Sequence, residues 1–290
     1  METFKNILIP FDFREQSEIA LSQSYNLARL TGLNITLLYV HEDGGFLNKF
    51  FSADQSDDLV KKMEVELDNF VKEKSKETGL DISFMVARGK IHTKIVEVAD
   101  MIQAKFIVMG TASSTIPEAN VIGANTSRVI RNAKCPVITV GSANHYDGCR
   151  SILLPLDLTK ESRQKVGWAI EMAKMFGATI KVITILWSTN HKEIAGTLRA
   201  QVAQVREFIE QRNVQCSAEV IEANKESEET PLIFKYAQDQ GDVDLIMIMT
   251  QHETGLIPFF LSSQSTEIIR LSSIPVMSII PKDTGDTLAR

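Results

Sequence analysis

An internal repeat constrains the fold of this 290-residue chain more than any other feature. Lys5–Asp12 (KNILIPFD) and Arg150–Asp157 (RSILLPLD) follow one pattern at an offset of 145 residues. Because self-similarity over a long period marks repeated architecture, the chain is predicted to contain one fold twice. We place the two domains at residues 1–141 and 150–281, joined by the polar stretch Ser142–Cys149.

The far end of each half repeats as well. Phe106–Met109 matches Ile246–Met249 at an offset of 140, and Cys135–Val140 matches Ile274–Ile279 at an offset of 139. The falling offset predicts small deletions in the second half. This alignment places Thr250 opposite Gly110.

Each half alternates short apolar runs with helical periodicity. Apolar residues recur every three or four positions over Asp57–Glu77, opposite charged ones, as on an amphipathic helix. That stripe is Leu59, Val60, Met63, Leu67, Phe70 and Val71, and the predicted strands of the first half are Ile7–Phe11, Ile35–Val40, Ile82–Val86, Phe106–Met109 and Val137–Val140. The alternation predicts the α/β class: two tandem Rossmann-like domains, each a five-stranded parallel sheet with helices on both faces.

Composition and charge exclude several functions. Thirty-one Lys plus Arg against 37 Asp plus Glu give a net charge of −6, which disfavours binding to nucleic acid or to an anionic membrane surface. No run of about 18 apolar residues and no signal-peptide pattern occur, so we expect a cytoplasmic protein. Cys135, Cys149 and Cys216 are widely spaced, which predicts reduced thiols and no metal site.

Chemistry is expected where parallel strands end. Asp12 follows the first strand, Gly110 closes the fourth, and Gly123 precedes a predicted helix. Glycine permits close approach of main-chain N–H groups, and a helix N-terminus offers unpaired donors, so these residues could hold phosphates. The alternative is that both glycines serve only a turn and a helix entry, with Asn125 or Thr126 as the N-cap.

Four segments together resemble the universal stress protein family. They are Ile9–Asp12, Leu38–Val40, Ile107–Gly110 and Asn132–Val137. The second half is similar as well, so the chain resembles the tandem-domain, UspA-like members. The family implies a stress-response binding or regulatory protein that is not an enzyme.

The resemblance also implies a nucleotide site in the first half. The nucleotide-binding branch carries Gly, two residues, Gly, nine residues, then Gly and Ser or Thr; here Ser113 replaces the second glycine and Ala124 follows Gly123. Asp12 and the Val40 main chain would face adenine and ribose, and the other residues would surround ribose and phosphates. The implied site is Pro10, Asp12, Val40, Met109, Gly110, Ser113, Gly123, Ala124, Asn125 and Thr126. ATP is the expected ligand, with Mg²⁺ beside a triphosphate.

The second half departs further from this pattern. Thr250 stands opposite Gly110 and Ser262 opposite Gly123, and the bulky Ile257–Leu261 lies between them. We therefore predict that ATP binds in the first domain only. Asp157 is then a strand-end or helix-capping carboxylate.

Two other functions stay open. The chain could be an interaction scaffold that binds no nucleotide and acts through the aromatic segment Phe46–Phe51. It could also be an enzyme of the wider adenine nucleotide α-hydrolase group, although the Ser-Gly-Gly phosphate loop of that group is absent. The halves are expected to pair within the chain as two subunits would, and the chain could form a homodimer.

Overall fold

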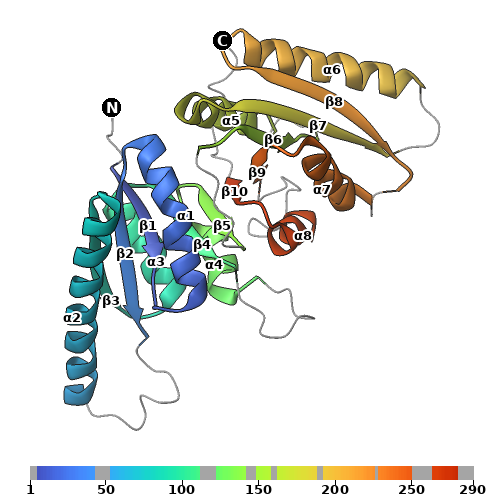
Figure 1. Cartoon of the computed structure of the whole chain (residues 1–290). Helices are drawn as coiled ribbons and strands as arrows, with labels where there is room; N and C mark the ends of the chain where they lie inside the picture. Colours follow the sequence, from blue (N-terminus) through green and yellow to red (C-terminus); the bar gives the residue numbers. More distant parts are fainter. Residues whose placement is uncertain are drawn as a thin grey trace. The chain divides into compact units, whose positions relative to one another are not determined.

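The computed structural model describes residues 5–42, 53–111, 122–141, 148–157, 162–187, 192–225, 228–249 and 263–279. The chain divides into two compact units, Met1–Gly148 and Cys149–Arg290. Each unit is a Rossmann-like α/β domain built on five parallel strands (Figure 1). The fold class predicted from the sequence is confirmed.

The sheet of the first unit creates a crevice at its middle. Its strand order is β3-β2-β1-β4-β5, so the order reverses between β1 and β4. A ligand of such a sheet binds at the carboxyl ends of the two strands that flank this reversal. The strands are β1 Asn6–Pro10, β2 Asn34–His41, β3 Ile82–Arg88, β4 Ala104–Gly110 and β5 Val137–Val140.

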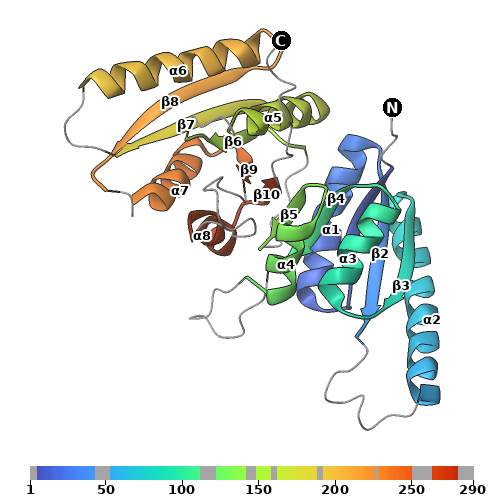
Figure 2. The same cartoon turned by 180° about the vertical axis from the view of Figure 1, so that it is seen from behind.

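Four helices cover the two faces of this sheet. The helix α1 packs over β1, β4 and β5 and α2 over β3, while α3 packs on β2 and β4 and beside α4 (Figures 1 and 2). Because both faces are covered, the middle of the central strand is buried, and Ile7, Leu8 and Ile9 are 0% exposed. The helices are α1 Glu15–Thr31, α2 Ala53–Thr78, α3 Ile91–Met101 and α4 Ala124–Asn132.

One member of the predicted stripe on α2 faces solvent. Val60, Leu67 and Val71 are buried, but Leu59 is 46% exposed. The helix has 26 residues, about 39 Å, whereas the seven residues of β3 span about 23 Å. Its first turns therefore extend past the sheet (Figure 1). Within those turns Leu59 faces solvent, whereas the neighbouring Val60 is buried.

The second unit repeats the topology with the order β8-β7-β6-β9-β10. Its helices α5 and α6 pack on β6 to β9, and α7 packs against β9 and α8. The strands are β6 Ser151–Pro155, β7 Thr179–Trp187, β8 Cys216–Ala223, β9 Val243–Met249 and β10 Val276–Ile279; the helices are α5 Ser162–Phe176, α6 Lys192–Glu210, α7 Glu229–Gln240 and α8 Ser263–Leu271.

Strand pairing corrects the alignment of the two halves. In the first unit Gly110 pairs with Val140, and in the second Met249 pairs with Ile279. Since Ile279 corresponds to Val140, Met249 and not Thr250 occupies the place of Gly110. The predicted offset of 140 was wrong, because two runs of similar apolar residues carry no mark of register, whereas the hydrogen-bonded ladder fixes it.

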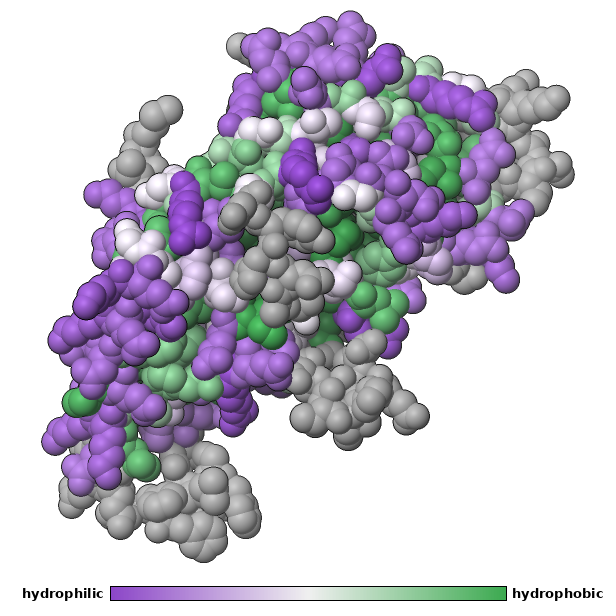
Figure 3. All heavy atoms as spheres, viewed as in Figure 1, coloured by the Kyte–Doolittle hydropathy of each residue, from purple (hydrophilic) through white to green (hydrophobic). Residues whose placement is uncertain are grey.

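One face of the described surface is mostly hydrophilic. Figure 3 shows hydrophilic side chains over most of the visible face, α2 included. Among the helices of the described residues, none is long and apolar enough to cross a membrane. All three cysteines are free, and burial raises the pKa of each thiol to about 12.

Candidate functional site

Asp12 lies just past the carboxyl end of β1, where its side chain also contacts the start of the next helix. Its Oδ1 accepts hydrogen bonds from the Arg14 N–H at 3.2 Å and from the Ser17 hydroxyl at 2.9 Å. Its Oδ2 lies 3.5 Å from Nε of the exposed Arg14 guanidinium. The side chain is 50% exposed, so a ligand can reach part of the carboxylate.

The main chain of Val40 faces the same crevice. The Leu38 carbonyl accepts a hydrogen bond from the Phe11 N–H at 2.9 Å, and the His41 carbonyl accepts one from Gly89 on the other side. Because successive residues of a strand turn their polar groups to alternate sides, the N–H and C=O of Val40 point toward β1, past its last residue. The main chain of Val40 can therefore form hydrogen bonds with polar groups of a ligand in the crevice.

Gly110 is required by packing and not by a left-handed backbone. Its φ is not positive, but a Cβ placed on it would lie 2.5 Å from the main-chain oxygen of Gln16 and 2.8 Å from the Gln16 Cβ. The missing side chain thus lets the first turn of α1 reach the end of β4. The turn role offered as the alternative is not observed for Gly110, which is the last residue of β4. Packing against α1 accounts for a glycine here without a ligand.

The N-terminus of α4 carries the strongest anion-binding feature. Gly123 is the N-cap residue with φ −54°, and among the described residues no side chain caps this helix, so neither Asn125 nor Thr126 has the predicted capping role. No described side chain therefore satisfies the first N–H groups of the helix, and unpaired N–H groups of this kind can bind an anion. Ala124 is exposed and Asn125 half-buried, whereas Thr126 is buried and its hydroxyl donates to the Gly110 carbonyl at 3.4 Å.

The remaining predicted residues contribute less. Pro10 is the half-buried last residue of β1, and the Met109 side chain, 7% exposed, belongs to the core. Ser113 and the segment Phe46–Phe51 lie outside the described residues. Within the part of the chain that is described, no cluster of three or more His, Cys, Asp or Glu side chains could hold a metal ion.

An aromatic cluster beside Asp12 was not predicted. Phe13 has φ 60°, a left-handed conformation that is costly for a bulky residue, and its ring lies edge-on to Phe11 at 5.0 Å between ring centroids. Phe70 of α2 lies 5.4 Å from Phe13 and 5.0 Å from Phe11. The three rings fix the turn that carries Asp12 out of β1 and into α1.

In the second unit a methionine and a buried lysine change the equivalent crevice. Met249 brings a side chain to the position where α1 meets Gly110 in the first unit. Ser265 corresponds to Thr126 and donates to the Met249 carbonyl at 2.8 Å, so the tether between helix and strand end is kept. Lys165 of α5 replaces the buried Ala20, and its ammonium donates to the Pro155 carbonyl at the end of β6.

Burial is the main influence on the charge of Lys165. It lowers the pKa of the ammonium to about 8, while the carboxylates Asp157 and Glu229 act in the opposite direction. Sequence reasoning missed Lys165, although the offset of 145 places it opposite Ala20 on the buried side of the first helix. The second crevice thus holds an internal cation, and among the described residues of the first unit no lysine or arginine is buried in this way.

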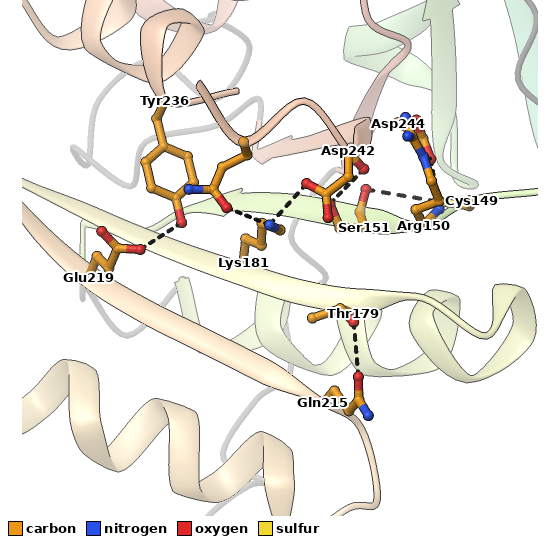
Figure 4. A network of polar contacts seen from close by, with 11 residues as sticks. Cys149, Arg150, Ser151, Thr179, Lys181, Gln215, Glu219, Tyr236, Asp242 and Asp244 are labelled. Carbon is orange, nitrogen blue, oxygen red and sulfur yellow. Dashed lines mark hydrogen bonds and ion pairs between the residues drawn. The ribbon is translucent and has the colours of Figure 1, made fainter. Parts of the chain in front are cut away.

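The opposite edge of the second unit carries a network of polar contacts (Figure 4). Arg150 donates from two guanidinium nitrogens to Asp244 at 2.7 and 3.0 Å, and Lys181 forms an ion pair with Asp242 at 2.9 Å. These residues lie at the amino ends of β6, β7 and β9, away from the ligand-binding edge. The network therefore connects the amino ends of these strands, and it contributes to the stability of the second unit.

Comparisons with known proteins give a consistent result. The model of the universal stress protein family matches residues 3–141 and 148–279. A universal stress protein of Methanocaldococcus jannaschii is 32% identical over 139 residues, which are 47% of this chain and 82% of that protein. A second one from the same organism is 25% identical over 158 residues, covering 49% of this chain and 97% of that protein.

A solved structure shares the whole fold. The crystal structure of a universal stress protein from Archaeoglobus fulgidus covers 96% of this chain and 98% of its own, with a TM-score of 0.77 and 17% identity. At that identity the likeness shows the fold alone. Another universal stress protein from Archaeoglobus fulgidus was solved in complex with dAMP; it covers 45% of this chain at 16% identity and a TM-score of 0.37, which says nothing about the ligand of this chain.

Proposed function

Because the chain belongs to the universal stress protein family, matched by both of its halves, we propose that it is a cytoplasmic stress-response protein that binds one adenine nucleotide. The domains are residues 1–141 and 150–281, and the nucleotide site is in the first. Binding, and not catalysis, is the proposed activity. A triphosphate would bring Mg²⁺ with it.

The uncapped N-terminus of α4 carries this proposal. It presents main-chain N–H donors and a positive dipole end at the carboxyl edge of the sheet, where phosphates are held in such folds. The half-exposed carboxylate of Asp12 and the main chain of Val40 suit the hydroxyl and amino donors of a nucleoside. Together they offer complementary groups for both ends of a nucleotide.

The second unit is proposed not to bind nucleotide in this way. Met249 places a side chain where the first unit has none, and the buried Lys165 already interacts with Asp157, the counterpart of Asp12. Asp157 therefore has a cationic neighbour inside the protein. Its role is to balance that charge.

Asp12→Asn tests the site with little disturbance of α1. The amide keeps the Oδ1 acceptor for Arg14 and Ser17 but turns the other oxygen into a donor. We expect ATP affinity, measured by isothermal titration calorimetry with Mg²⁺, to fall by about 1–3 kcal/mol, the range for losing a hydrogen bond to a charged group.

Asp157→Asn is the matched control, because Asp157 holds the same position in the second unit. It should leave ATP affinity unchanged. Equal affinity of wild type and Asp12→Asn would remove Asp12 from the site. Absence of any ATP binding, together with an unchanged melting temperature at millimolar ATP, would favour the interaction scaffold instead, because a bound ligand stabilises the native state.

A further inference from the structure

Gln16 has a buried acceptor that lacks a partner. Its Oε1 is inaccessible to solvent, and no hydrogen-bond donor among the described residues reaches it. Buried polar atoms are nearly always paired, since an unmade hydrogen bond costs the folded state the desolvation of that atom. An orphaned acceptor beside a ligand-binding crevice therefore points to a donor supplied by the ligand.

The position of Gln16 favours that interpretation. Its Cβ lies 2.8 Å from the point where a Cβ of Gly110 would be, so its side chain starts against the carboxyl end of β4. Asp12 lies at the end of β1, on the other side of the reversal in strand order. The orphaned hydroxyls of Thr184 and Ser278, by contrast, are on strands of the second unit.

The order of groups along the sheet edge indicates which part of a ligand Gln16 would meet. The Val40 main chain belongs to β2, Asp12 follows β1, Gln16 adjoins β4, and the uncapped N–H groups begin α4. Gln16 thus lies between the groups proposed for the nucleoside and those proposed for the phosphates. An amide oxygen cannot pair with a phosphate oxygen, because both are acceptors, but it pairs well with a hydroxyl.

We propose that Gln16 Oε1 accepts a hydrogen bond from a ribose hydroxyl of the nucleotide bound in the first unit. The inference rests on the proposed nucleotide binding and adds a residue that recognises one hydroxyl of the sugar. Gln16 positions the sugar and takes no part in a reaction. At the corresponding position of the sequence the second half has Glu161.

A thermodynamic cycle between protein and ligand tests this contact. Dissociation constants for ATP, 2′-deoxy-ATP and 3′-deoxy-ATP are measured by calorimetry on wild type and on Gln16→Met, which has similar length and no acceptor. Wild type should bind one of the two deoxynucleotides about three- to tenfold more weakly than ATP. Gln16→Met should bind ATP more weakly by a similar factor and show no further loss with that deoxynucleotide.

Two more variants separate a direct contact from a structural effect. Gln16→Glu keeps an acceptor and should keep the preference for the same hydroxyl even if overall affinity falls. Glu18→Gln, an exposed change on the same turn, should behave as wild type. Gln16→Met without ligand should melt no lower than wild type, because it removes an unpaired buried atom.

The outcomes are distinguishable. If wild type binds ATP and both deoxynucleotides equally, or if Gln16→Met retains the wild-type preference, the role of Gln16 is contradicted while nucleotide binding stands. If wild type binds no nucleotide, the proposed function itself fails.

Discussion

A single replacement illustrates how the two copies have diverged at the residue scale. The buried position on the first helix is Ala20 in one unit and Lys165 in the other. A solvated lysine keeps its proton to a pH near 10.5, but burial lowers the pKa of Lys165 to about 8. The second unit therefore carries a desolvated charge at neutral pH that the first unit does not have.

This charge makes the stability of the second unit dependent on pH. Between about pH 8 and 10.5 the unfolded chain holds the Lys165 proton and the folded chain does not, so stability rises with pH in that window. We expect wild type to gain on the order of 2 kcal/mol relative to Lys165→Met between pH 7 and pH 9.5. Both tryptophans, Trp168 and Trp187, belong to the second unit, so their fluorescence in urea follows its unfolding alone.

The stability of wild type is compared with that of Lys165→Met at each pH, because other groups titrate in a similar pH range. The thiols of Cys149 and Cys216 have a pKa raised to about 12 in the folded state, which lowers stability as pH rises above about 9. That effect is common to both proteins and cancels in the difference. A difference between wild type and Lys165→Met that does not change with pH would show that Lys165 is not desolvated.

At the scale of elements, the contact between α1 and β4 shapes the first crevice. The main chain of Gln16 lies where any side chain at residue 110 would project. The second unit has Met249 at that position. The first unit therefore leaves the strand end without a side chain where the first turn of α1 packs against it.

Gly110→Ala should therefore destabilise the first unit. The new Cβ would lie 2.5 Å from a backbone oxygen, and a main-chain atom can move away only by shifting the helix. We expect a loss of about 1–3 kcal/mol, typical of overpacking. The measurement is urea unfolding by circular dichroism, with tryptophan fluorescence reporting that the second unit is unchanged.

Gly196→Ala is the control for the sign of this effect. Gly196 lies within α6, and a Cβ there would meet no atom within 4 Å. Alanine should stabilise that helix by up to about 1 kcal/mol, as expected from helix propensity. If Gly110→Ala were stabilising as well, the close approach of α1 to β4 would be wrong.

Whether an element could be predicted depended on how distinctive its pattern of apolar residues is. The strands of the first half were predicted within a few residues, because runs such as Ile35–Val40 are apolar on both faces and flanked by helical stripes. The register of the fourth strand of the second half was not predictable. Ile246–Met249 and Phe106–Met109 are both short apolar runs, but they do not occupy equivalent positions in the two sheets. Gln16 and Lys165 were missed because a polar residue in an amphipathic helix is usually solvated, and only the packing shows that part of each side chain is buried.

At the scale of the whole molecule, two copies of one domain have kept the fold and changed the crevice. Both retain the parallel sheet, the carboxylate after the first strand and the hydroxyl tether to the end of the fourth strand. They differ at the end of the fourth strand, where Gly110 of the first unit corresponds to Met249 of the second. They also differ in the buried Lys165, which only the second unit has at this position. The proposed division of labour is thus one ligand-binding copy and one copy whose charge is balanced internally.

The number of nucleotides bound per chain tests this division most directly. Calorimetric titration of the full chain with Mg²⁺ and ATP should give one site per chain, weakened by Asp12→Asn and untouched by Asp157→Asn. Two equivalent sites, or a single site that is lost in Asp157→Asn and kept in Asp12→Asn, would contradict the assignment of the nucleotide to the first unit.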